Sequence, residues 1–181
     1  MAALVAALLI RATDKSAGFV AMSAERSGKP GAVLLAATIA LAATLSVATA
    51  AGFLIGPRVS PNATRLMLGL SLVAAASGAI WPGKTPVIDD VRRPFWGTLT
   101  GMISTGLTGS TEFVVFTTAA WGTAALAGIG GLIGSMVILS AAVVAGETLW
   151  RPLPHRAIGV VVGVVLFVVG AWLAASGLRL I

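Results

Sequence analysis

Six apolar runs, separated by short polar segments, occupy almost the whole chain. A helix needs about 20 mostly apolar residues to cross the hydrocarbon core of a bilayer, and each run reaches that length. We therefore predict an all-α membrane protein. Its six transmembrane helices are expected at residues 2–24, 31–56, 62–81, 95–121, 125–147 and 156–178.

The composition excludes a water-soluble surface. Hydrophobic residues make up 57% of the 181 residues and charged residues only 10%, whereas soluble domains carry about 25% charged residues. The net charge of +6 comes from basic residues that lie singly or in pairs, without the cluster typical of a nucleic-acid-binding surface. We expect a lipid bilayer as the partner, and no nucleic acid.

Basic residues are unevenly distributed over the predicted loops. Seven fall in the first, third and fifth loops: Arg26, Lys29, Lys84, Arg92, Arg93, Arg151 and Arg156. Three fall on the opposite side: Arg58, Arg65 and Arg179. Short cytoplasmic loops of membrane proteins are enriched in Lys and Arg. We therefore predict a multi-pass protein of the cell (inner) membrane with both termini on the non-cytoplasmic side.

The two halves of the chain can be aligned with each other. Thr13 then matches Thr111, Asp14 matches Glu112, and an R-x-x-P pattern at 58–61 matches one at 151–154. We predict a first three-helix repeat over 1–81, a cytoplasmic linker over 82–94 and a second repeat over 95–181. Because each repeat has an odd number of helices, the second is inverted relative to the first. Inverted repeats are typical of transporters with a binding site near the bilayer midplane.

Four ionisable residues fall away from the ends of the predicted helices, two of each sign: Arg11, Asp14, Lys15 and Glu112. A charge at the bilayer centre costs about 2.5 to 3.5 kcal/mol on insertion scales, so each is a candidate for function. Arg11 and Asp14 lie three residues apart and share a helix face. Glu112 has no basic neighbour in its own helix, so it needs a partner across the interface, water, an ion or a proton. The alternative is that Arg11 and Lys15 extend to the membrane surface while Asp14 only pairs with Arg11.

Hydroxyl side chains line the predicted fourth helix near its acid. Ser104, Thr108, Thr111 and Glu112 are spaced to share one side of a helix. Three glycines loosen the same helix: Gly101, Gly106 and Gly109. Broken helices expose backbone carbonyls to substrates in many transporters. The alternative is that the hydroxyls bond to their own helix or mediate helix packing.

The first copy of the repeat resembles a motif of the Gdt-type cation/proton exchangers. This family includes calcium and manganese transporters of Golgi and chloroplast and bacterial manganese exporters, and it shares the architecture of the lysine-exporter superfamily. Each of its repeats carries Glu-x-Gly-Asp-[Lys/Arg]-[Thr/Ser] in the first helix. Asp14, Lys15 and Ser16 match the last three positions, while Arg11 replaces the glutamate and Thr13 the glycine.

The second copy is more divergent. Glu112 stands in for the aspartate of the motif, Gly109 replaces the glutamate and Phe113 the basic residue. Two of the four carboxylates of the family are therefore absent, and hard divalent cations prefer several anionic oxygen ligands.

The resemblance implies a secondary transporter that exchanges a manganese- or calcium-like cation for protons. Asp14 and Glu112 would be the metal ligands. The same binding site would include Thr13, Thr111, Ser16, Arg11, Lys15 and Thr108. Two alternatives follow from the altered motifs: a non-transporting homologue that serves as a membrane scaffold or subunit, and an exporter of a small solute such as an amino acid, whose carboxylate would meet Arg11.

We expect neither a resident cofactor nor enzymatic activity. The sequence has no cysteine and one histidine, His155, in a predicted loop, which leaves few groups for catalysis. The partners expected are the bilayer, the transported ion or solute and, in a homo-oligomer, further copies of the chain.

Overall fold

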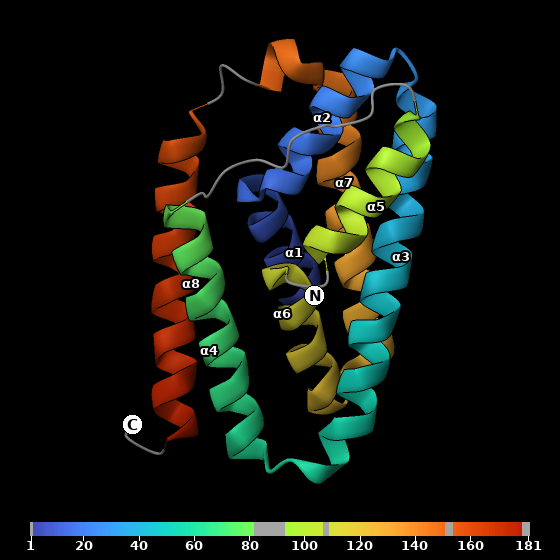
Figure 1. Ribbon diagram of the computed structural model, residues 1–181. Helices are drawn as coiled ribbons and strands as arrows, with labels where there is room; N and C mark the ends of the chain where they lie inside the picture. Colours follow the sequence, from blue (N-terminus) through green and yellow to red (C-terminus); the bar gives the residue numbers. More distant parts are fainter. Residues whose placement is uncertain (1, 82–92, 107–108, 151–153, 179–181) are drawn as a thin grey trace.

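The computed structural model describes residues 2–81, 93–106, 109–150 and 154–178. In these ranges the chain forms helices joined by short turns, with no strand (Figure 1). The first half contains α1 (Ala2–Thr13), α2 (Lys15–Ser27), α3 (Pro30–Ile55), the 3-10 turn η1 (Gly56–Arg58) and α4 (Pro61–Ile80). The second half contains α5 (Pro94–Gly106), α6 (Ser110–Thr118), the π-helical turn η2 (Ala119–Thr123), α7 (Ala124–Trp150) and α8 (His155–Gly177). The prediction of an all-α protein is confirmed.

Four helical segments of the described chain are long and apolar enough to cross a membrane: Pro30–Arg58, Pro61–Ile80, Ser110–Trp150 and Arg156–Gly177. Large apolar side chains on their outer faces are exposed, among them Val144, Leu126 and Phe167. Such a surface suits lipid and not water, so the helices indicate a membrane protein. The predicted runs at 31–56, 62–81 and 156–178 correspond to α3, α4 and α8.

The segment Ser110–Trp150 is two helices joined by a sharp turn. Gly122 adopts a φ of 94° within η2, a conformation that glycine adopts without strain. The chain reverses direction there, so that α6 and α7 run antiparallel (Figure 1). This turn separates the fourth predicted run from the fifth, close to the expected boundary.

The first and fourth predicted runs are each divided into two shorter helices. Asp14 separates α1 from α2 with an extended backbone (φ −80°, ψ 147°), so the prediction of one helix over 2–24 is wrong. In the fourth run, α5 ends at Gly106 and Gly109 is extended (φ −75°, ψ 139°) before α6. That break coincides with two of the three glycines expected to loosen this run.

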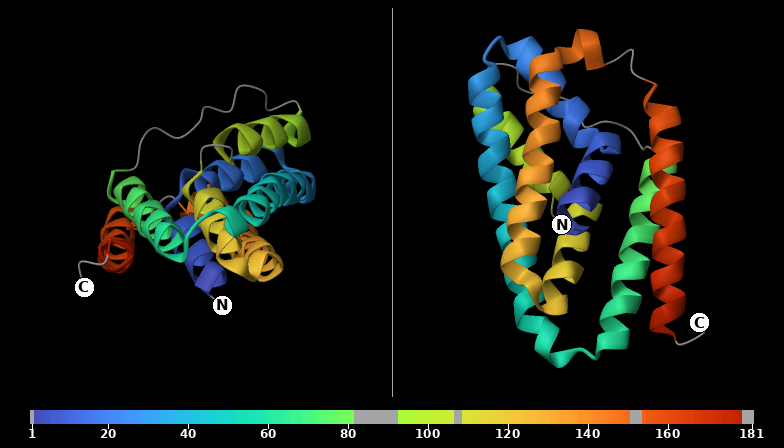
Figure 2. Two further views of the ribbon diagram at one scale, coloured as in Figure 1. Left: turned by 90° about the horizontal axis from the view of Figure 1, so that it is seen from below. Right: turned by 180° about the vertical axis from the view of Figure 1, so that it is seen from behind.

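The broken helices exchange partners between the two halves of the chain. Helices α1 and α2 pack on α7, whereas α5 and α6 pack on α3, and α4 pairs with α8. Seen from below, α1, α2 and α6 lie between the α4/α8 pair and the α3/α7 side of the bundle (Figure 2). In both side views α1 begins near mid-height of the bundle and rises obliquely (Figures 1 and 2). The centre of the molecule is therefore built from interrupted helices of both halves.

One end of the bundle is fastened by polar contacts between α2 and α7. The Glu25 carboxylate accepts hydrogen bonds from the backbone N–H groups of Glu147 and Thr148, next to Gly146, where φ is 64°. Arg26 pairs with Glu147 at 3.1 Å, and the hydrogen bond and charge of Glu147 raise the pKa of Arg26. These contacts join the two halves at the end where α2 and α7 both stop.

Candidate functional site

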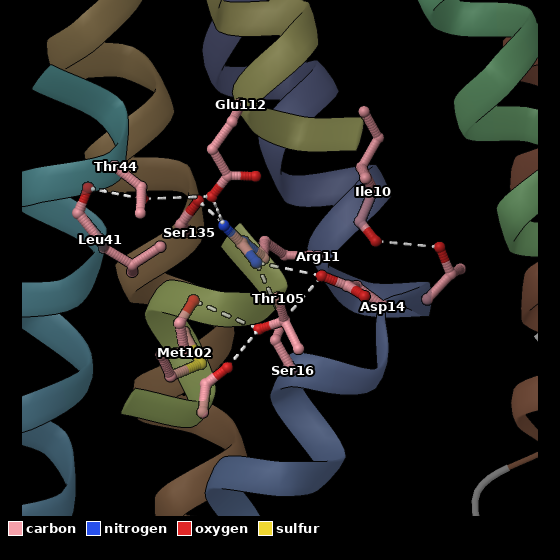
Figure 3. A network of polar contacts seen from close by, with 12 residues as sticks. Ile10, Arg11, Asp14, Ser16, Leu41, Thr44, Met102, Thr105, Glu112 and Ser135 are labelled. Atoms are coloured by element: carbon pink, nitrogen blue, oxygen red, sulfur yellow. Dashed lines mark hydrogen bonds and ion pairs between the residues drawn. The ribbon is translucent and has the colours of Figure 1, made fainter. Parts of the chain in front are cut away.

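A buried arginine joins carboxylates from the two halves of the chain (Figure 3). Arg11 lies in the last turn of α1 and is 1% exposed. Its Nη1 donates to Asp14 Oδ2 at 3.0 Å, and its Nη2 donates to Glu112 Oε1 at 2.5 Å. Arg11 thus lies between the two acids, which were predicted to share one binding site. The alternative that Arg11 extends to the membrane surface is wrong, because the guanidinium is fully buried.

Hydroxyl groups from three other positions complete the contacts of this centre. Ser16 Oγ accepts from Arg11 Nη1 at 3.0 Å and donates to Asp14 Oδ2 at 2.8 Å. Ser135 Oγ on α7 accepts from Arg11 Nε at 3.4 Å, and Thr44 Oγ1 on α3 donates to Glu112 Oε1 at 3.4 Å. We call the set Arg11, Asp14, Ser16, Thr44, Glu112 and Ser135 the Arg11 network. Thr44 and Ser135 were not predicted, because nothing in the sequence distinguishes them from the other hydroxyl residues of the same apolar runs.

The break at Asp14 makes this geometry possible. In a continuous helix, Asp14 and Ser16 would point in different directions. With Asp14 extended at the start of α2, both side chains reach the guanidinium of Arg11. Hydrogen bonds to charged groups contribute about 1.5–3 kcal/mol each, which helps to offset the backbone interruption. The network and the break therefore stabilise each other.

The formal charge of the network is −1, because one guanidinium serves two carboxylates. Glu112 is only 6% exposed, and its Oε2 atom has no hydrogen-bond partner within the described ranges. Oε2 lies against Gly109, where a Cβ atom would sit 2.1 Å from it. Any side chain at position 109 would thus collide with the carboxylate of Glu112.

Two cavities border the network from different sides. One, of about 440 Å³, is lined by apolar residues such as Ile10, Trp81 and Phe113 and by polar residues that include Thr13, Asp14, Lys15, Ser16 and Ser110. The other, of about 350 Å³, is lined by Thr44, Val47, Ala48, Gly106, Gly109, Glu112, Phe113 and Phe116. We call them the Asp14 cavity and the Glu112 groove. Gly109 and Phe113 border both, so the two acids face separate spaces with the buried Arg11 between them.

Three other predicted site residues, Thr13, Lys15 and Thr111, are not members of the Arg11 network. The Thr13 hydroxyl borders the Asp14 cavity but bonds to the carbonyls of Leu9 and Ile10 in its own helix. Lys15 borders the same cavity and makes no ion pair within the described part of the chain. Thr111 is buried, and its hydroxyl lacks a partner among the described residues.

The predicted hydroxyl stripe on the fourth run is not a continuous face. Ser104 is exposed, and its hydroxyl donates to the carbonyl of Gly101 in its own helix. The interruption between α5 and α6 also changes the direction of the helix axis before Thr111 and Glu112. The prediction is therefore wrong for Ser104. Thr108 lies outside the described residues, as do Lys84, Arg92, Arg151, Arg179 and most of the predicted linker over 82–94.

The acids of the Arg11 network provide few ligands for a metal ion. Within the ranges that the structure describes, no group of three or more His, Cys, Asp or Glu side chains is placed to hold a metal ion. Arg11 fills the space between the carboxylates of Asp14 and Glu112 that a bridging cation would take. A divalent ion, which needs about six to eight oxygen ligands in the case of calcium, would have to displace this guanidinium.

The hydroxyl of Ser16 is expected to contribute measurably to stability. Replacement by alanine removes one acceptor for Arg11 and one donor to Asp14, so Ser16→Ala should lower the free energy of unfolding by about 1–3 kcal/mol. Ser104→Ala is the matched control, because that exposed hydroxyl contacts only its own helix, and its effect should stay within about 0.5 kcal/mol. Thermal unfolding of the purified protein in detergent measures both. Equal midpoints for the two variants would contradict the role assigned to Ser16.

Comparison with protein-family models, curated proteins and solved structures finds no match to this chain. The resemblance to the Gdt-type exchangers therefore rests on the predicted two-repeat layout and on the motif residues of the two repeats.

Proposed function

We propose that this chain is a secondary transporter, in which protons and a transported cation bind alternately at the carboxylates of the Arg11 network. The observation that carries the proposal is one buried guanidinium shared by Asp14 and Glu112, which come from two interrupted helices and border separate cavities. Buried charges are costly in a membrane protein and are typical of ion and proton pathways.

The proposed membrane arrangement has six crossing segments, formed by two inverted three-helix repeats in the cell membrane, with both termini non-cytoplasmic. The exchange of partners supports it, because each interrupted helix packs on the middle helix of the other half. The first crossing segment consists of α1 and α2 together and enters the membrane obliquely. The fourth consists of α5 and α6. The distribution of basic residues over the loops supports the orientation.

In the proposed cycle, Arg11 acts as a tethered cation. When neither acid is protonated, the guanidinium balances part of their charge. Protonation of Glu112 or Asp14 removes the ion pair between that acid and Arg11, and the guanidinium then pairs with the other acid alone. Such a redistribution favours one cavity over the other, which is the two-state behaviour that coupled transport requires.

The transport proposal predicts that neutral replacements of the acids abolish coupling. In proteoliposomes with an internal pH indicator, Asp14→Asn and Glu112→Gln should each lower cation-driven proton flux at least about tenfold, equivalent to about 1.4 kcal/mol. Glu147→Gln is the control, since it changes an acid of the exposed α2–α7 contact and should leave the flux near that of the unmodified protein. Undiminished flux in both Asp14→Asn and Glu112→Gln would reject the assignment.

A second candidate is a non-transporting membrane scaffold or subunit. The observation that favours it is that Arg11 already pairs with both acids and so links the halves of the chain. A scaffold would show no proton flux with any cation tested, and Asp14→Asn and Glu112→Gln would change only its stability. The proteoliposome experiment therefore separates the two functions.

A further inference from the structure

We propose that the Glu112 groove contains a binding site for one monovalent alkali cation, with Glu112 Oε2 as its charged ligand. The inference rests on the proposed transport function in one respect, since it names the cation that this site would carry. The binding itself can be measured without transport.

The first step concerns the carboxylate oxygen of Glu112 that lacks a hydrogen-bond partner. Oε1 accepts hydrogen bonds from Arg11 and Thr44, whereas Oε2 is buried and has no partner among the residues described. A buried charged oxygen without a partner is costly, and nearly all buried polar atoms in proteins have one. A bound cation would satisfy Oε2 without disturbing the bonds of Oε1.

The second step is the set of neutral oxygens around the same space. A Cβ atom on Gly109 would lie 2.1 Å from Glu112 Oε2 and 3.2 Å from the carbonyl oxygen of Gly106. A Cβ atom on Gly106 would lie 3.3 Å from Thr44 Oγ1 and 3.4 Å from Glu112 Oε1. Carboxylate, carbonyl and hydroxyl oxygens therefore lie near the two glycines, and the methyl group of Thr44 borders the same space, 3.0 Å from a Cβ atom on Gly106.

The break between α5 and α6 affects the electrostatic field at the proposed cation site. Gly106 is the last residue of α5, and the final carbonyls of a helix carry partial negative charge. Half-helix ends and unwound carbonyls near a midplane site are suited to bind alkali cations. The carbonyl oxygen of Gly106 accepts from the N–H of Gly109 at 3.0 Å and so lies at the break. Glu112 itself lies in the first turn of α6, where the positive end of the helix favours its ionised carboxylate.

The third step is the charge. With Arg11, Asp14 and Glu112 ionised, the network carries −1, and one monovalent cation would neutralise it. A divalent ion would leave an excess positive charge and would find one free carboxylate oxygen, too few for its preferred shell. Lys15 lies in the other cavity with Asp14, and no basic residue lines the Glu112 groove within the described ranges.

The test measures sodium-dependent stability of the purified full chain in detergent. NaCl is exchanged for N-methylglucamine chloride at constant ionic strength, and the midpoint of thermal unfolding is followed. A ligand that binds the folded state raises the midpoint with its concentration, so we expect a saturable rise for the unmodified protein. Thr44→Val should need roughly tenfold more sodium for the same rise, as expected for one lost ligand. Glu112→Gln and Gly109→Ala should show no sodium-dependent rise.

Thr38→Val is the matched control on α3. Its hydroxyl donates to the carbonyl of Leu34 in the same helix and to Met136 Sδ on α7, and it lies outside the groove, so its sodium response should equal that of the unmodified protein. No sodium-dependent rise in the unmodified protein, or an undiminished rise in Thr44→Val or Glu112→Gln, overturns the proposal. A larger rise with CaCl2 than with NaCl at the same concentration overturns the monovalent assignment.

The two proposals can fail separately. If proton flux depends on Asp14 and Glu112 but sodium has no effect on unfolding, the cation site is wrong and transport stands. If sodium stabilises the protein through Thr44 and Glu112 but flux is absent, transport is wrong and the site stands.

Discussion

Arg11→Met is expected to lower the free energy of unfolding by about 3–5 kcal/mol, the cost of removing one partner from a buried ion pair. Methionine matches much of the length and apolar volume of arginine, so the main loss is the charge. The Asp14 side chain is 32% exposed and borders a cavity. Water can therefore replace part of its lost ion pair with Arg11, which makes this part of the destabilisation smaller. Glu112 is almost fully buried, and its carboxylate would keep only the hydrogen bond from the Thr44 hydroxyl.

A second substitution separates charge from packing. In Arg11→Met with Glu112→Gln, the buried carboxylate is gone, so most of the lost stability should return. The midpoints of the two single variants and the double variant, measured by thermal unfolding in detergent, form a double-mutant cycle. If the double variant loses the sum of the single losses, Arg11 and Glu112 are not coupled and the network is wrong.

The acids and the arginine were predictable because charge inside an apolar run is costly. That rule selected Arg11, Asp14, Lys15 and Glu112 from a sequence with few charged residues, and the structure places all of them except Lys15 in one network. The pairing of Glu112 with Arg11 was not predictable in detail, because nothing local to Glu112 identifies a partner in another helix. For the same reason Thr44 and Ser135 were missed, since hydroxyls in apolar runs more often bond to their own backbone.

The two helix breaks differ in how visible they are in the sequence. Between α5 and α6, Gly106 and Gly109 weaken the helix locally, and the glycines of this run were expected to loosen it, although one helix was predicted over 95–121. Around Asp14 no glycine or proline marks a break, and the residues before it favour a helix. The interruption depends on Asp14 and Ser16 reaching Arg11, a tertiary effect that no local pattern shows.

The α4/α8 pair depends on close backbone contact rather than on charge. A Cβ atom on Gly69 of α4 would lie 2.5 Å from the backbone nitrogen of Ala174 and 2.6 Å from the carbonyl oxygen of Gly170, both on α8. Small residues allow such close approach between helices in membranes, where packing replaces the hydrophobic effect as the force for association. Backbone atoms on α8 cannot rotate away as a side chain can. A larger residue at position 69 must therefore separate the two helices.

Gly69→Leu is accordingly expected to lower the free energy of unfolding by about 3 kcal/mol, at the upper end of the usual cost of overpacking. Gly78→Leu is the matched control on the same helix, because a Cβ atom there meets no heavy atom within 4 Å. Both substitutions gain the same helix propensity, of about 0.8–1 kcal/mol, so the difference between their thermal midpoints in detergent isolates the α4/α8 contact. Equal midpoints would show that α8 does not lie against Gly69 at this distance, and the packing of the α4/α8 pair would have to be revised.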